Sequence, residues 1–325
     1  MAQPLLDVQQ LQTYFFADQG ARMVKAVDGV SFTLAEGETL GIVGESGSGK
    51  TVTSLSILRL LPTAAHIVGG EIWFAGENLL AKSEREMRHV RGSQITMILQ
   101  DPMMSLNPLF TIGEQIAEPL RLHRGMRGTT IIERIKEVLR DVRIPSPEVR
   151  MREYPHQMSG GMRQRIVGAI SISCEPRLLI ADEPTTSLDV TIQAQYLKLL
   201  KDIQQQNGLA MIFITHNIGI VARMCDQVAV MYAGRLVERA PVRTIFNQPA
   251  HPYTEALLHA VPKLTDHSER LWSIVGQPPD PANLPPGCPF NPRCPKAEDR
   301  CHVEVPPEYQ VGDNHYTRCW LWESR

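Results

Sequence analysis

Hydrophobic and polar residues form two patterns along the chain, and each pattern predicts a type of strand. Short alternating runs predict half-buried strands near the N-terminus, at Leu5–Val8, Val24–Val27 and Val30–Leu34. Continuous short apolar runs predict strands that are buried on both faces, as in parallel sheets, at Thr39–Val43, Leu178–Ala181 and Met211–Ile214. The chain therefore reads as an α/β protein.

Helical spacing of apolar residues dominates the middle of the chain. Ile131–Val142 predicts an amphipathic helix, and Pro145 and Pro147 follow it as stop signals. We expect a helical subdomain, inserted in the α/β pattern at about residues 88–165. After His251 the chain becomes rich in Pro and Cys.

Composition narrows the class of protein. The chain has 325 residues, of which 43% are hydrophobic and 21% charged, as in globular proteins. The net charge of −2 gives no argument for nucleic-acid binding. No apolar run approaches the ~20 residues that span a bilayer, and Met1–Asp7 lacks a signal-peptide pattern. We expect a cytoplasmic chain whose membrane role, if it has one, needs a spanning partner.

A phosphate-binding loop follows the predicted strand Thr39–Val43. Its pattern is Gly-x4-Gly-Lys-Thr, and residues with helical spacing come next, which is the context that such a loop requires. Backbone N–H groups would bind phosphate oxygens, the lysine would supply a charge, and the threonine hydroxyl would ligate Mg²⁺. We expect ATP to bind at Gly44, Glu45, Ser46, Gly47, Ser48, Gly49, Lys50 and Thr51.

Two carboxylates end the apolar run Leu178–Ala181. Asp182 can hold Mg²⁺ through water, and Glu183 would then face the γ-phosphate and polarise the attacking water. This pairing predicts hydrolysis of the bound nucleotide.

The segment Met158–Arg165 resembles the signature motif of ABC ATPases, with Met158 where Leu is usual. Ser159, Gly160 and Gly161 open a helix and leave N–H donors for an anion. In ABC ATPases that anion is the γ-phosphate bound by the opposite subunit, so the resemblance implies a dimer.

Other segments are similar to further ABC motifs, in the same order along the chain. Gln100 looks like the glutamine that contacts Mg²⁺ and water, and Ser187–Asp189 looks like the D-loop, with Asp189 at the nucleotide. His216 looks like the switch histidine, although Asn217 stands where Asp usually follows. Phe15 fits the spacing of the aromatic residue that stacks on adenine, with Tyr14 and Phe16 as the other candidates.

Five segments are together similar to the oligopeptide/dipeptide/nickel importer branch of this family. They are Gln100–Pro108, Tyr154–Gln157, Ala181–Thr186, Val190–Gln195 and His251–Thr254. The resemblance implies an ABC ATPase domain at 1–250, with a RecA-like core, an antiparallel β subdomain and the helical subdomain, followed by a Cys/Pro-rich C-terminal extension at 251–325.

The same resemblance implies an ATP-hydrolysing subunit on the cytoplasmic face of the cell membrane. It would drive the uptake of di- and oligopeptides, or alternatively of nickel or glutathione. Implied partners are a second and related ATPase chain, two transmembrane permease subunits and an extracytoplasmic solute-binding protein.

Four cysteines crowd the C-terminal end. Cys288, Cys294, Cys301 and Cys319 can hold Zn²⁺ or a [4Fe–4S] cluster, or can stay free or form disulfides. Resemblance to peptide-importer ATPases implies the iron–sulfur cluster. Cys174 and Cys225 stand in apolar surroundings and are expected to be buried thiols.

Three rival functions predict other features. A soluble ABC protein of DNA repair or the ribosome would carry a coiled coil, a second cassette or a basic surface, and none is evident. A P-loop kinase or GTPase would not need Ser159–Gly161, and a GTPase would carry an N-K-x-D motif, which is absent. A regulator that binds ATP without turnover would not need Glu183 and His216.

Overall fold

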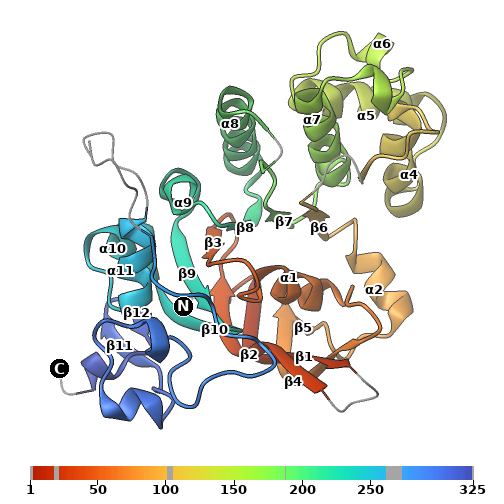
Figure 1. The fold of residues 1–325 in the computed structure, drawn as a ribbon. Helices are drawn as coiled ribbons and strands as arrows, with labels where there is room; N and C mark the ends of the chain where they lie inside the picture. The colour runs from red at the N-terminus through yellow and green to blue at the C-terminus, as the bar shows by residue number, and fades with distance from the viewer. Residues whose placement is uncertain (1–2, 18–21, 101–104, 187, 261–272, 324–325) are drawn as a thin grey trace. The chain divides into compact units, whose positions relative to one another are not determined.

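The computed structural model describes residues 3–17, 22–100, 105–186, 188–260 and 273–323. The chain divides into two compact units. Unit 1 comprises the described residues within 1–34, 39–80 and 213–325, and unit 2 comprises residues 35–38 with the described residues within 81–212. Figure 1 labels the elements of both units.

Unit 1 contains an antiparallel sheet with the strand order β2-β1-β4-β5. Its strands are β1 (Leu6–Ala17), β2 (Arg22–Leu34), β4 (Ala65–Phe74) and β5 (Glu77–Asn78). The runs predicted as separate strands at Val24–Val27 and Val30–Leu34 belong to the single strand β2. Gly29, at φ 75°, is the extra residue of a bulge between the pairs Leu11–Val30 and Gln12–Asp28, so the strand continues through it.

A second, mixed sheet in unit 1 has the strand order β11-β12-β10-β9-β3. Its strands are β3 (Thr39–Val43), β9 (Gln227–Tyr232), β10 (Arg235–Pro241), β11 (Tyr309–Gly312) and β12 (His315–Thr317). β3 runs parallel to β9, whereas β10, β11 and β12 pair antiparallel. All five residues of β3 are buried, which confirms the strand that the continuous apolar run predicts.

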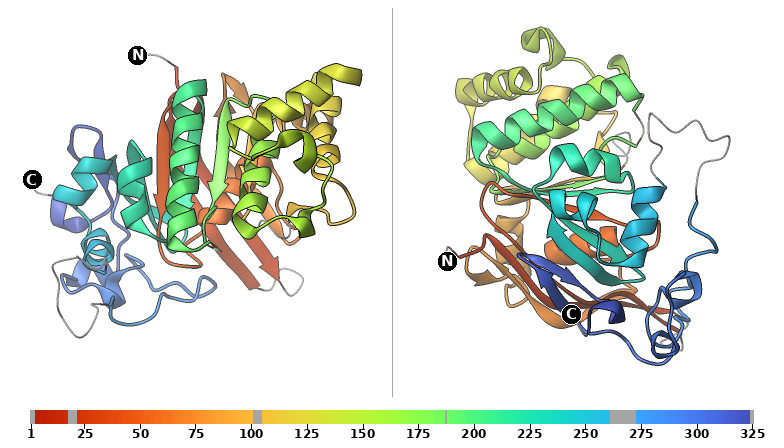
Figure 2. Two further views of the ribbon diagram at one scale, coloured as in Figure 1. Left: turned by 90° about the horizontal axis from the view of Figure 1, so that it is seen from above. Right: turned by 90° about the vertical axis from the view of Figure 1, so that its left-hand side faces the viewer.

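The helices of unit 1 are short. They are α1 (Lys50–Leu58), α9 (Ile218–Met224), α10 (Val242–Asn247), α11 (Pro252–His259) and the 3₁₀ turns η3 (Asn291–Arg293), η4 (Asp299–His302) and η5 (Trp320–Trp322). The C-terminal segment, blue in Figures 1 and 2, lies beside α10 and α11 in all views. Two contacts hold it there: Trp322 Nε1 donates to the Ala250 carbonyl, and Lys296 pairs with Glu255.

Unit 2 joins parallel strands to a group of helices. Its strands are β6 (Ile95–Ile98) and β7 (Leu178–Asp182), which pair in parallel, and β8 (Ala210–Thr215) begins in this unit. Its helices are α2 (Glu84–Val90), α4 (Ile112–Arg124), α5 (Gly128–Asp141), α6 (Pro147–Arg150), η2 (Pro155–Gln157), α7 (Gly160–Ile172) and α8 (Val190–Asn207). The apolar runs at 178–181 and 211–214 are therefore strands, as predicted.

Helices α4, α5, α6 and α7 lie together in Figure 1. α5 buries Ile131, Ile135, Val138 and Leu139, so the helical spacing predicts this element correctly. Pro147 opens α6 at a position where a missing N–H is harmless. Among the described residues, no helix combines the length and the apolar character that crossing a membrane would demand.

Candidate functional site

The phosphate loop of unit 1 links β3 to α1. Its shape depends on glycine at three positions, because Gly44 has φ 157°, Gly47 has φ 78° and Gly49 has φ 103°. A Cβ atom on Gly49 would lie 2.2 Å from the Ala26 carbonyl oxygen, whereas a Cβ on Gly47 would meet no atom within 4 Å. Position 49 therefore requires glycine both for its backbone conformation and because a side chain has no room there. Position 47 requires glycine for its conformation alone.

Lys50 lies at the start of α1 with its amine turned back into the loop. Its Nζ atom donates to the carbonyl oxygens of Gly44 at 2.8 Å and Glu45 at 2.9 Å, and the side chain is buried. Ser46, Gly47 and Thr51 are exposed. A buried ammonium group at a helix N-terminus, beside an exposed glycine turn, suits a polyanion.

His216 follows β8 and is exposed. The next residue, Asn217, caps α9: its Oδ1 atom accepts from Gly219 N at 3.0 Å. An amide oxygen serves this capping role as well as a carboxylate does. The departure from the usual Asp is therefore structurally accommodated.

Gln100 and Glu183 meet in unit 2. They follow the parallel strands β6 and β7, whose carboxyl ends lie at the same edge. Gln100 Nε2 donates to Glu183 Oε2 at 2.9 Å, and Thr186 Oγ1 donates to the same oxygen at 3.1 Å. Glu183 has φ 46°, an unusual value for a residue with a side chain, and this conformation ends the strand just past the buried Asp182.

The segment at Met158–Gly161 begins α7. Ser159 is the N-cap and its hydroxyl accepts from Met162 N, while Ser159 and Gly160 are exposed. A Cβ atom on Gly160 would meet no atom within 4 Å of it, whereas one on Gly161 would lie 2.7 Å from Ile192 Cγ2. Met158 is buried. The helix N-terminus is open to an approaching anion.

The remaining predicted residues occupy ordinary structural positions. Asp189 caps α8 by accepting from Thr191 N and Ile192 N, and Ser187 lies outside the described residues, as do residues 101–104. In β1, the Tyr14 hydroxyl donates to Asp28, and the Phe16 ring lies 5.9 Å from the His66 ring. Phe15 is half-buried, and its stacking on adenine stays a prediction.

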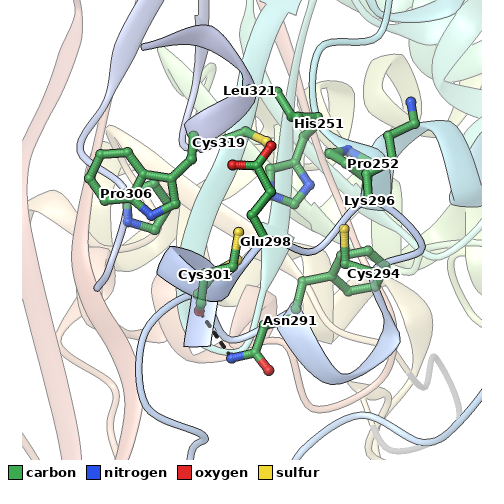
Figure 3. A pocket seen from close by; sticks show the side chains of 13 residues that line it. His251, Pro252, Asn291, Cys294, Lys296, Glu298, Cys301, Pro306, Cys319 and Leu321 are labelled. Atoms are coloured by element: carbon green, nitrogen blue, oxygen red, sulfur yellow. Dashed lines mark hydrogen bonds between the residues drawn. The ribbon is translucent and has the colours of Figure 1, made fainter. Parts of the chain in front are cut away.

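The four C-terminal cysteines line one cavity of unit 1. Figure 3 shows the sulfur atoms of Cys294, Cys301 and Cys319 around the same space, with His251 and Glu298 beside them. Cys288 lines it too, and the cavity has about 360 Å³ of empty space, including the part open to solvent. Gly287 brings the chain close enough for Cys288 N to donate to the Cys301 carbonyl at 2.9 Å.

Burial disfavours the thiolate forms of Cys288 and Cys319. It raises the pKa of Cys288 to about 11 and that of Cys319 to about 12, and the neighbouring cysteines add to both shifts. Within the part of the chain that the structure describes, no three His, Cys, Asp or Glu side chains are arranged around a common metal-ion position. The thiols share a cavity without converging on one point. Cys174 and Cys225 are buried, as expected.

Two residues that touch the phosphate loop were not predicted. Tyr253 accepts a hydrogen bond from Glu45 N at 2.9 Å, and Arg293 pairs with the Glu45 carboxylate. Both lie more than 200 residues from Glu45, and the sequence carries no local signal that joins them.

The chain resembles known proteins along nearly its whole length. The family model for ABC transporters matches residues 27–186, and the model for the oligopeptide/dipeptide transporter C-terminal region matches residues 237–301. The dipeptide transport ATP-binding protein DppD of Bacillus subtilis is 49% identical, over 99% of this chain and 96% of that protein. The oligopeptide transport ATP-binding protein AppD of the same species is 47% identical, over 98% and 97%.

A third relative comes from Sinorhizobium fredii. It is described as a probable peptide ABC transporter ATP-binding protein and is 50% identical, over 97% of this chain and 94% of that protein. Among solved structures, an ATP-binding cassette in a dimeric post-hydrolysis state with ADP and phosphate superimposes with a TM-score of 0.65. It is 24% identical and covers 73% of this chain and 99% of that chain, so it supports the fold.

Proposed function

The chain belongs to the ABC transporter family of ATP-binding proteins, and we propose that it hydrolyses ATP to drive the uptake of di- and oligopeptides. The observation that carries this proposal is similarity to peptide-transport ATP-binding proteins over both the ATPase region and the C-terminal region. Its domains are the ATPase region at 1–250 and the extension at 251–325.

We assign a role in ATP binding to each predicted residue. The phosphate loop, residues 44–51, cradles the polyphosphate, and Lys50 contributes the positive charge. Phe15 stacks on adenine. Thr51, Asp182 and Gln100 would hold Mg²⁺, which would supply positive charge beside the β- and γ-phosphates.

Hydrolysis depends on Glu183 and His216. Glu183 orients the attacking water and accepts its proton, and the bond from Gln100 Nε2 supports this role by fixing one carboxylate oxygen. His216 contacts the γ-phosphate of the bound ATP. The nucleotide bound by a second and related ATPase chain is contacted by Ser159, Gly160, Gly161 and Asp189. Ser159 and Gly160 are exposed, as this contact requires.

A groove in unit 2 suits a membrane partner. It lies along α4, where Phe110, Leu122 and Ile170 share its wall with Glu114, Glu118 and Arg121. Leu122 is 75% exposed and the nearby Leu109 is 81% exposed. We assign it to a cytoplasmic helix of one of two permease subunits, which would place the chain on the cytoplasmic face of the cell membrane. An extracytoplasmic binding protein would supply the peptide. We expect no nucleic-acid partner.

The cysteine cavity is proposed to hold a [4Fe–4S] cluster, with Zn²⁺ as the alternative. Four thiols on one cavity supply the right donors for either group. The resemblance to peptide-importer ATPases favours the cluster. Anaerobic purification followed by assays of iron, sulfide and zinc distinguishes the two.

Uptake by cells tests the imported cargo. A strain that lacks this chain is complemented with wild type or with Glu183→Gln, and uptake of labelled dipeptide, tripeptide, glutathione and Ni²⁺ is compared. We expect peptide uptake to fall and to return only with wild type. Loss of Ni²⁺ or glutathione uptake instead would move the cargo to that class, and no change in any uptake would contradict the import function.

A further inference from the structure

Glu45, in the phosphate loop, is held at two points by the C-terminal part of unit 1. Its backbone N–H donates to Tyr253 Oη at 2.9 Å. Its carboxylate accepts from Arg293 through both oxygens, at 2.6 Å from Nη1 and 3.0 Å from Nη2. This paired geometry is the strong form of an arginine–carboxylate contact.

Arg293 is itself fixed from several directions. Its side chain is 4% exposed, against 27% for Glu45. Nε donates to the Val275 carbonyl at 3.1 Å and Nη1 donates to Tyr232 Oη at 3.3 Å, while the guanidinium lies over the Tyr232 and Phe290 rings. The guanidinium therefore has little freedom, and it imposes its position on Glu45.

Glu45 also shapes the loop from within. Its carbonyl oxygen accepts from Lys50 Nζ at 2.9 Å and from Ser48 N at 3.2 Å. A shift of Glu45 would move both the lysine and the backbone N–H groups that face the phosphates. In addition, the guanidinium neutralises a carboxylate that would otherwise stand beside the nucleotide's polyphosphate.

The same arginine belongs to the cysteine segment. Arg293 ends η3 and directly precedes Cys294. Phe290, one turn earlier, lines the cysteine cavity and packs against Tyr232 and Tyr253, with ring centroids 5.3 Å away in each case. One aromatic cluster thus forms a wall of the cysteine cavity and a support of the phosphate loop.

We propose that Arg293 is a positioning residue of the ATPase, which holds the phosphate loop in its nucleotide-binding form by clamping Glu45. The clamp joins the loop to the cysteine segment, so the C-terminal region is part of the ATP site. The inference rests on ATP binding by this chain and is independent of the imported cargo.

The test measures the affinity of the purified full-length chain for a fluorescent ATP analogue, mant-ATP, with Mg²⁺. Arg293→Ala should weaken binding about 10-fold, since a hydrogen bond to a charged group is worth about 1.5–3 kcal/mol and tenfold is about 1.4 kcal/mol. Arg293→Lys, which keeps the charge but cannot bridge both oxygens, should weaken it roughly threefold. The lysine variant carries the test if the alanine variant does not fold.

A double variant of Arg293 and Glu45 distinguishes a role of Arg293 in positioning the loop from a role in folding alone. Glu45→Gln removes the charge that Arg293 neutralises and should weaken binding roughly threefold. Combined with Arg293→Ala it should still bind within about threefold of wild type, far better than the product of the single effects. A role in folding alone would lower the melting temperature without this relief.

Arg300→Ala is the matched control. Arg300 lies in the same segment and pairs with Glu304 and Glu323, but it is 40% exposed and makes its contacts within the C-terminal region. Its variant should bind as wild type does. The inference is overturned if Arg293→Ala binds like wild type, if Arg300→Ala weakens binding equally, or if Glu45→Gln brings no relief. Failure of wild type to bind mant-ATP would instead contradict the ATPase function itself.

Discussion

The phosphate loop and the cysteine cavity lie in the same unit but are built in opposite ways. The loop is eight consecutive residues, and its chemistry comes mostly from backbone groups that glycines allow to turn inward. The cavity gathers side chains from Cys288 to Cys319, along a segment of short 3₁₀ turns and one small hairpin. The sequence of a loop of consecutive backbone groups is enough to identify the ligand as a phosphate. Four thiols from a longer segment suit either Zn²⁺ or an iron–sulfur cluster, so they do not identify the bound group.

The largest effect is expected at the phosphate loop, from Lys50→Ala. Truncating a buried, hydrogen-bonded charge typically costs about 2–5 kcal/mol, so nucleotide affinity should fall by about 30-fold or more. Equilibrium titration with mant-ATP measures this loss. The exposed Lys198→Ala is the control, and unchanged affinity in Lys50→Ala would contradict the proposed role of the loop.

Two glycine variants test whether backbone shape defines the loop. Gly49→Ala should abolish nucleotide binding, because its Cβ would lie 2.2 Å from the Ala26 carbonyl oxygen. Gly47→Ala meets open space and should cost only the conformational strain of about 1–2 kcal/mol, or roughly tenfold in affinity. Equal effects of the two variants in the same titration would show that space around the loop is not decisive.

Cys294→Ser tests the cysteine cavity. The serine hydroxyl is a poor ligand for iron, so bound iron and sulfide should fall severalfold in anaerobically purified protein. Cys174→Ser, at a buried cysteine of unit 2, should leave both contents unchanged. If both variants keep the wild-type content of iron, sulfide and zinc, the proposed ligand role is wrong.

The smallest effect is expected for His251, in the wall of the cysteine cavity, and concerns the stability of the fold at acidic pH. Burial lowers the pKa of His251 to about 4 from its ordinary value of 6.5. The neutral ring therefore stabilises the fold above pH 6.5, and this contribution is lost as the pH falls from 6.5 through 4. His251 Nδ1 also accepts from Tyr253 N and so caps α11.

His251→Asn keeps a capping acceptor and removes the titration. Between pH 6.5 and 4, the wild type should lose roughly 1–3 kcal/mol more free energy of unfolding than the variant. Denaturant unfolding at the two pH values measures this difference. An identical pH dependence in both proteins would show that His251 does not titrate in this range.

The sequence predicts the elements and motifs that depend on neighbouring residues. The strand at Thr39–Val43, the loop after it and the helix over Ile131–Val142 are all confirmed. The sequence pattern predicts separate strands at Val24–Val27 and Val30–Leu34, but both runs belong to one strand that continues through the Gly29 bulge. A bulge is decided by the partner strand, which a local pattern does not include.

Contacts between distant residues show the limit of sequence reasoning at the site. Family resemblance predicts that Gln100 and Glu183 serve one site, and they do share a hydrogen bond. The pair Arg293–Glu45 spans 248 residues and belongs to no motif quoted above, so only the fold reveals it. The four C-terminal cysteines line one cavity, as expected for a common site, but the choice between a cluster and Zn²⁺ depends on sulfur positions that the sequence does not determine.

The central claim is most directly tested by ATP hydrolysis in the assembled transporter. The chain is reconstituted in proteoliposomes with its ATPase partner, permease subunits and binding protein, and phosphate release is measured with and without dipeptide. We predict that dipeptide stimulates hydrolysis and that Glu183→Gln slows it by about 10²–10⁴-fold while mant-ATP still binds. Hydrolysis at the wild-type rate in Glu183→Gln, or a wild-type rate indifferent to every peptide supplied, would contradict the account.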